Sequence, residues 1–193
     1  MKHPIRSLPP DSILPAMLAG LTLLITGCAT IHENTCAQFE ENRKDRDYST
    51  QYQISEADSE SASRNYKKLP RGKTVIVRLY KMRVDPPSIK PCHHLMIHKD
   101  IYLQRDVRTR PNLEEVRDFY TDSGKLIASK TESISDQLRT SGYYTGETPL
   151  PIPEKAPPGK YRIVSRLIMR ASGKSRAIVL ARTTTSFEVV SRE

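Results

Sequence analysis

The sequence predicts a mostly β protein, an antiparallel β-sandwich that follows a flexible N-terminal tether. Short segments in which polar and apolar residues alternate recur after residue 72, and a period of two is typical of half-buried strands. Turn-forming residues separate these segments, and the chain holds 14 Pro but only 8 Gly. About seven such strands over about 115 residues favour two sheets packed face to face.

The length of 193 residues allows one domain with a hydrophobic core and an appendage, but not two ordinary domains. The net charge is +9. Residues 29–72 carry 7 Lys and Arg against 8 Asp and Glu, a net of −1, whereas residues 73–193 carry 22 against 13, a net of +9. The basic charge therefore belongs to the predicted domain, where it admits anionic partners without choosing among them.

The chain opens with a segment typical of a secretory signal. Lys2 and Arg6 precede an apolar run at residues 13–27. A helix that spans a bilayer needs about 20 apolar residues, and this run is shorter, with no basic flank after it. A signal peptide over residues 1–27 is therefore predicted rather than a membrane-spanning helix.

The end of this segment, Ile25-Thr26-Gly27-Cys28, resembles the lipobox of bacterial lipoproteins. The resemblance implies that the Cys28 thiol receives a diacylglyceryl group, that the signal peptide is removed just before it, and that the new amino terminus is acylated. Two or more acyl chains anchor a protein stably. Ala29 follows the cysteine in place of Asp, which implies sorting to the outer membrane, facing the periplasm or the cell surface. The alternative is an ordinary signal peptide whose cleavage site contains a cysteine.

Residues 28–72 are predicted to form the flexible tether. The segment is polar, and its larger aliphatic and Phe side chains are limited to Ile31, Phe39, Ile54 and Leu69. Such a stretch buries too little apolar surface to offset the entropy lost on ordering, apart from a helical turn or two near residues 36–46. The β-sandwich domain is then expected over residues 73–193.

The strands are expected in a defined order. Residues 73–84 alternate and end at a Pro pair, residues 93–104 form a second extended run, and residues 116–130 form two strands about Gly124, which can take the positive φ of a tight turn. A short helix is expected within residues 131–140, and a Pro-rich crossing follows it. Residues 160–170 and 176–190 then form a closing hairpin.

The segment Pro157-Pro158-Gly159-Lys160-Tyr161 resembles the start of a late strand in immunoglobulin-like and transthyretin-like extracellular domains. In those domains a Tyr pins the corner between strands. The resemblance implies that Tyr161 has this part, and it bears on the fold rather than on the function.

Three cysteines suggest one possible disulfide. With Cys28 lipidated, Cys36 and Cys92 remain as an even pair in an oxidising compartment. A bond between them would tie the tether to the domain. Two free or separately buried thiols are the alternative that the sequence leaves open.

The strand from Cys92 to His98 carries the sharpest chemical pattern. On a strand, Cys92, His94, Met96 and His98 share one face, and thiolate, imidazole and thioether groups suit copper or zinc. Successive residues of that face lie about 7 Å apart, so four ligands do not easily converge on one ion. We therefore predict no cofactor, and we keep a metal- or ligand-binding module on this strand as the alternative function.

A basic face is predicted on the penultimate strand, from Arg162, Arg166 and Arg170. Such a face can dock an anionic partner. The alternative is that these long side chains solvate the outer face and protect the sheet from edge pairing. Nucleic acid is not expected as the partner, because the segment lacks stacking aromatic residues and the compartment is wrong.

The sequence lacks the motifs of common catalytic sites: G-x-S-x-G, H-E-x-x-H and a phosphate-binding Gly loop. Glu114, Glu115 and Asp118 form an acidic patch that is expected in a solvated loop. The sequence therefore predicts an envelope lipoprotein that is not an enzyme and has an interaction or structural role beside an envelope protein partner.

Overall fold

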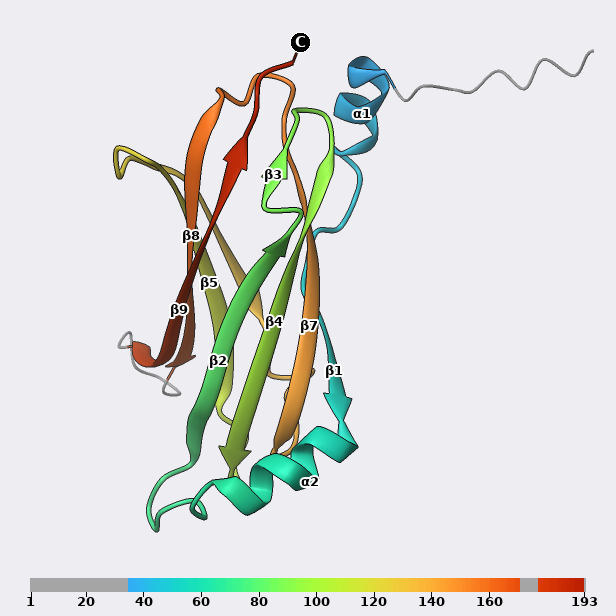
Figure 1. Ribbon diagram of the computed structural model, residues 1–193. Helices are drawn as coiled ribbons and strands as arrows, with labels where there is room; N and C mark the ends of the chain where they lie inside the picture. The colour runs from blue at the N-terminus through green and yellow to red at the C-terminus, as the bar shows by residue number, and fades with distance from the viewer. Residues whose placement is uncertain (1–34, 171–176, 193) are drawn as a thin grey trace, which may run out of the picture. The chain divides into compact units, whose positions relative to one another are not determined.

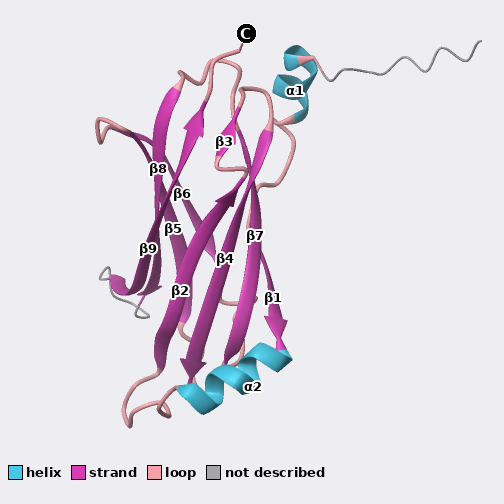
Figure 2. Ribbon diagram, in the orientation of Figure 1, coloured by secondary structure: helices cyan, strands magenta, loops and turns pink. Residues whose placement is uncertain are grey.

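The computed structural model describes residues 35–170 and 177–192, which fold as two β-sheets packed face to face with two short helices (Figures 1 and 2). The four-stranded sheet has the order β1 (Gln51–Ser55), β7 (Gly142–Pro151), β4 (His94–Arg105) and β2 (Val75–Asp85). The five-stranded sheet has the order β3 (Ser88–Ile89), β9 (Ala177–Val189), β8 (Gly159–Arg170), β5 (Asn112–Thr121) and β6 (Leu126–Ser133). The helices are α1 (Cys36–Asn42) and α2 (Glu56–Asn65).

The predicted β-sandwich is confirmed. Every pair of neighbouring strands is antiparallel except the short parallel pair β3 and β9. Strands β2 and β4 match the predicted runs to within two residues. The β5–β6 turn contains Gly124 with φ of +81°, the left-handed conformation that glycine adopts without strain. No helix among the described residues is long and apolar enough to cross a membrane.

The corner before β8 has the predicted form. The hydroxyl of Tyr161 donates to the carbonyl oxygen of Pro157, four residues earlier, at 2.6 Å. The Tyr161 ring stacks on Phe187 of β9, with centroids 5.4 Å apart. Tyr161 therefore fixes the end of the Pro-rich crossing against the five-stranded sheet.

The prediction of a flexible tether over residues 28–72 is wrong for the part that the structure describes. Residues 36–65 form α1, β1 and α2, and β1 hydrogen-bonds along β7 as an edge strand. The segment has few aliphatic residues, but Phe39 and Tyr52 are buried and the backbone pairs with the sheet. Thr35 and Ser55 cap the two helices by accepting from backbone N–H groups. The sandwich therefore includes this segment and does not begin at residue 73.

The core consists of two hydrophobic clusters, one toward each end of the sandwich. Along β4, Leu95 and Ile97 belong to one cluster, and Ile101 and Leu103 belong to the other. Lys99 lies between the two clusters, at an inward-facing position of β4, and is buried. The middle layer of the sandwich is therefore polar.

Candidate anion-binding site

The possible anionic-partner face lies on β8, and two of its three arginines are already paired with carboxylates. Its three residues are Arg162, Arg166 and Arg170. Asp118 of the neighbouring strand β5 pairs with Arg166, and Glu114 lies 2.7 Å from the Nε atom of Arg170. The guanidinium of Arg162 lies over the ring of Tyr120, 5.3 Å from its centroid. Carboxylates of β5 therefore compensate two of the three charges of this face, and the third lies over an aromatic ring.

On the strand kept as the alternative metal site, Cys92, His94 and His98 each contact another side chain. Cys92 and Cys36 form a disulfide, with Cα atoms 5.3 Å apart. The Nε2 atom of His94 lies 3.3 Å from the Tyr48 hydroxyl, and burial, with Arg46 and His93 nearby, lowers the pKa of His94.

Further along the strand, His98 Nδ1 lies 3.2 Å from a carboxylate oxygen of Glu147. Met96 lies between the two histidines on β4, and four residues along a strand span about 13 Å. Among the described residues, one group of three side chains has metal-ligand spacing, Cys36, Cys92 and Glu154, and two of its three atoms are the disulfide sulfurs. Cys28, the predicted site of lipid attachment, lies outside the described residues.

A buried ionic cluster occupies the polar middle layer. The Nζ atom of Lys99 lies 2.8 Å from Glu115, and both side chains are 0% exposed. Glu115 also accepts hydrogen bonds from hydroxyl groups, those of Thr50, Tyr52, Tyr80 and Ser165. On the same strand, Arg117 is buried and pairs with Glu132. The cluster is sealed from solvent, so it is structural rather than a ligand site.

The pKa values in this cluster follow from burial and pairing. Burial by itself raises the pKa of Glu115, but Lys99 and Arg117 outweigh it and hold the value at about 2. Burial lowers the pKa of Lys99 to about 8, although Glu115 opposes that change. Both groups are therefore charged near pH 7.

We expect this cluster to make stability fall in acid. Below the ordinary pKa of 4.5, Glu115 takes up a proton in the unfolded chain, whereas in the folded chain it stays ionised down to about pH 2. The unfolded state then binds more protons, so the free energy of unfolding rises with pH across this window and falls as pH drops. Denaturant unfolding at a series of pH values gives the free energy of unfolding as a function of pH. Between about pH 2 and pH 4.5, this free energy should change less steeply with pH for Glu115→Gln than for the wild type. Equal slopes would contradict the assignment.

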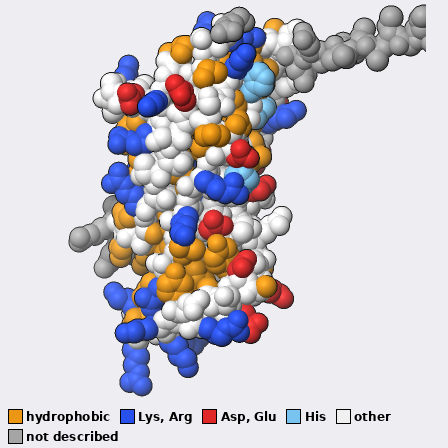
Figure 3. All heavy atoms as spheres, in the orientation of Figure 1, with side chains coloured by type: hydrophobic (Ala, Val, Ile, Leu, Met, Phe, Trp, Pro, Cys, Tyr) orange, Lys and Arg blue, Asp and Glu red, His pale blue; other side chains and the backbone are white. Residues whose placement is uncertain are grey.

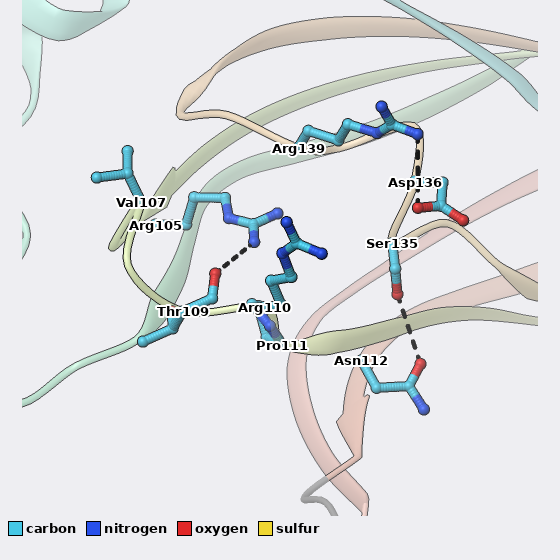
Figure 4. Close-up of a pocket in the computed structure, with 9 residues that line it drawn as sticks. All are labelled: Arg105, Val107, Thr109, Arg110, Pro111, Asn112, Ser135, Asp136 and Arg139. Carbon is cyan, nitrogen blue, oxygen red and sulfur yellow. Dashed lines mark hydrogen bonds and ion pairs between the residues drawn. The ribbon is translucent and has the colours of Figure 1, made fainter.

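The described residues also line a cavity at the far end of β4, with a volume of about 550 Å³. It lies between the β4–β5 loop and the β6–β7 loop (Figure 4). Three of its lining residues are arginines: Arg105, Arg110 and Arg139. Asp136, Ser135 and Asn112 contribute the carboxylate, hydroxyl and amide groups of the lining. This arrangement is suited to binding an anion.

Arg105 holds the cavity together. Its Nη1 atom donates to the carbonyl oxygen of Leu138, and its Nη2 atom donates to that of Thr109, both at 2.7 Å. One guanidinium thus bridges the two loops that carry the other arginines. The backbone of Arg105 is fixed as well, because its N–H donates to Ser141 and its carbonyl accepts from the same hydroxyl. Hydrogen bonds to both loops therefore hold Arg105 at the base of the cavity.

The surrounding end of the sandwich is basic. Asp106 N–H donates to the carbonyl of Thr74, so the loop between α2 and β2 lies beside this end. That loop exposes Lys67, Lys68, Arg71 and Lys73. Lys and Arg side chains gather at the α2 end of the face seen in Figure 3. A field of one sign raises the local concentration of anions and speeds their arrival.

A second cavity lies at the opposite end of the sandwich. It measures about 540 Å³ and is mostly apolar, with Phe119, Ile127, Ile152 and Phe187 among its lining residues. Backbone hydrogen bonds join Ile152 to His93 and Cys92, so this cavity lies at the disulfide end. Nothing in its lining selects a particular ligand.

Comparison with known proteins finds only remote structural likeness. No family model matches the chain, and no curated protein matches it. Among solved structures, the C-terminal domain of Wzt is 12% identical, with a TM-score of 0.44 over 62% of this chain and 74% of that one. The CARDB domain of a Pyrococcus furiosus protein, solved with di-metal ions, is 13% identical, with a TM-score of 0.36 over 61% and 94%.

Proposed function

We propose that this protein is anchored by lipid at Cys28 in the bacterial cell envelope and acts there by binding rather than by catalysis. The observation that carries the proposal is the disulfide between Cys36 and Cys92. Disulfides form and persist in oxidising compartments such as the periplasm, and they are rare in the cytosol. A disulfide-bonded domain therefore agrees with export directed by residues 1–27 and with retention through the lipobox cysteine.

The positions of the cysteines suggest which end of the domain lies near the membrane. Eight residue steps separate Cys28 from Cys36, at most about 28 Å of extended chain. Cys92 lies two residues before the first residue of β4, and Arg105 is the last residue of β4, so the two lie at opposite ends of this strand. A 12-residue strand spans about 40 Å, so a lipid at Cys28 would hold the disulfide end near the bilayer and the arginine-lined cavity away from it.

Lipid attachment is tested by labelling with radioactive palmitate in cells. The wild-type protein is expected to incorporate label, and Cys28→Ser is expected to incorporate none, because the thioether linkage requires the thiol. Cys36→Ser is the matched control, since it removes a cysteine but keeps the lipobox, and it should be labelled like the wild type. Label retained by Cys28→Ser would overturn the proposal.

The alternative of a metal-binding module on the Cys92–His98 strand is less well supported, because Cys92 is in a disulfide and His94 and His98 contact Tyr48 and Glu147. Protein purified from the periplasm is expected to hold much less than one equivalent of copper or zinc. Stoichiometric metal that is lost in the double variant His94→Ala/His98→Ala would reinstate this alternative.

A further inference from the structure

We propose that the cavity of Arg105, Arg110 and Arg139 binds the phosphate group of a small phosphorylated molecule, a phosphate monoester. This inference deepens the proposed binding role, and it does not depend on the lipid anchor. The cavity lies within the β4–β5 and β6–β7 loops, both of which the structure describes.

The first argument is charge that the described residues leave uncompensated. The lining holds three arginines and one carboxylate, Asp136, a net of +2. Asp136 lies 3.6 Å from Arg139, and both side chains are mostly exposed, so that pair is weak. No carboxylate among the described residues lies within ion-pair distance of Arg105 or Arg110. On β8 the same chain pairs its arginines with Asp118 and Glu114.

The second argument is the burial of Arg105. Its side chain lines the cavity although the residue is only 8% exposed. Its two terminal nitrogens reach neutral carbonyl groups, and its buried Nε atom has no hydrogen-bond partner among the described residues. A buried charge is costly unless it is paired. An anion beside Arg105 would supply the missing countercharge.

The third argument is preorganisation. Arg105 already holds the two loops together, and Figure 4 shows its guanidinium directed toward that of Arg110. The Ser135 hydroxyl accepts from the N–H of Leu113, which fixes the other loop to β5. Sites whose side chains are held before binding lose less conformational entropy when the ligand arrives.

The charge and size favour a phosphate monoester over a simple carboxylate. A phosphate monoester carries a charge of about −1.5 to −2 at pH 7, which matches the net +2 of the lining. Its oxygens accept the paired N–H groups of planar guanidinium side chains. The cavity of about 550 Å³ lies within the size range of small-molecule sites, so it has room for the group that bears the phosphate.

The test is calorimetric titration of the mature protein in detergent at pH 7 and low salt, with glucose 6-phosphate, inorganic phosphate and glucose as probes. We expect one site for glucose 6-phosphate, weaker binding of inorganic phosphate and no binding of glucose. A parallel sedimentation assay without detergent compares phosphatidic acid vesicles with phosphatidylcholine vesicles, since the lipid anchor binds both alike. A preference for phosphatidic acid that glucose 6-phosphate does not compete away would indicate a lipid source of the phosphate. Binding of glucose as tight as that of its phosphate, or no binding of any phosphate probe, would overturn the proposal.

Matched variants separate the cavity from general surface charge. Arg110→Gln and Arg139→Gln, both at exposed positions, should fold normally and each weaken binding of glucose 6-phosphate about tenfold. Asp136→Asn should strengthen it severalfold, because the mutation removes the one negative charge of the lining.

Arg108→Gln is the control for these variants. Arg108 lies in the same loop as Arg110, pairs with Asp106 at 2.9 Å and does not line the cavity. The affinity of Arg108→Gln for glucose 6-phosphate should therefore stay within twofold of that of the wild type. An equal loss in Arg108→Gln, or tighter binding of citrate than of glucose 6-phosphate, would refute the assignment. The palmitate label is unaffected by either outcome, so the two proposals fail separately.

Discussion

Glu115→Gln is expected to lower the free energy of unfolding by about 3–5 kcal/mol, the cost of removing one partner of a buried ion pair. Lys99 would remain fully buried without its counter-ion. The hydroxyl donors around Glu115, among them Tyr80 and Ser165, would face an amide NH2 group in place of a carboxylate oxygen. Urea unfolding followed by circular dichroism measures the change.

Glu114→Gln is the matched control for this variant. Glu114 is the preceding residue of β5, and it pairs with Arg170 at the surface, where the Arg170 side chain is 43% exposed. Its loss should cost less than about 1 kcal/mol. The double variant Lys99→Met/Glu115→Gln should recover part of the stability, since it removes the unpaired charge. Equal, small losses in Glu114→Gln and Glu115→Gln would contradict the role assigned to the cluster.

Removal of the disulfide should have the second large effect. Cys36 and Cys92 are 56 residues apart, and the loop-closure entropy of such a crosslink corresponds to about 4 kcal/mol. The double variant Cys36→Ser/Cys92→Ser, and the wild type after reduction, should therefore unfold at lower urea concentration. Amide hydrogen exchange should show α1 opening first, because its buried residues are limited to Cys36 and Phe39.

The control is the response to a reducing agent. Reduction should shift the unfolding midpoint of the wild type and leave that of the double variant unchanged. A wild-type midpoint that does not change on reduction would show that the crosslink does not contribute to stability.

The strands of the sandwich were predictable because their side chains alternate, and the corner at Tyr161 was predictable from its Pro-Gly context. Composition predicts a tether over residues 36–65 because the segment has few apolar residues. The backbone hydrogen bonds that order it cannot be seen in composition. β1 is stabilised by its hydrogen bonds to β7 and by one buried aromatic residue, Tyr52.

The buried cluster was missed for a definable reason. The sequence predicts that this strand begins at Val116, which places Glu115 in the preceding loop. In the structure β5 begins at Asn112, so Glu115 lies within the strand. In the true register Leu113, Glu115 and Arg117 share the inward face of one strand. The sequence signal for the cluster was a set of charged residues at inward-facing positions of β4, β5 and β6. Which of these charges form ion pairs can be known only from the order of the strands in the two sheets.

The arginine cavity was also beyond the sequence. Arg105 and Arg139 are 34 positions apart, and the β4–β5 and β6–β7 loops meet only because β5 and β6 form a hairpin in the opposite sheet. The alternating arginines of β8 are easier to see in the sequence, but the carboxylates that pair with Arg166 and Arg170 come from β5. The other two arginines of the cavity, Arg110 and Arg139, lie in loops rather than on the regular face of a strand.

The central claim is that this protein is held in the envelope by lipid at Cys28. The most direct measurement is mass spectrometry of the N-terminal tryptic peptide from protein extracted from membranes. After reduction of the Cys36–Cys92 disulfide, the account predicts a peptide that begins at Cys28, ends at Arg43 and carries the added mass of a diacylglyceryl group and an acyl chain. An unmodified Cys28 within a peptide that begins before it would contradict the account.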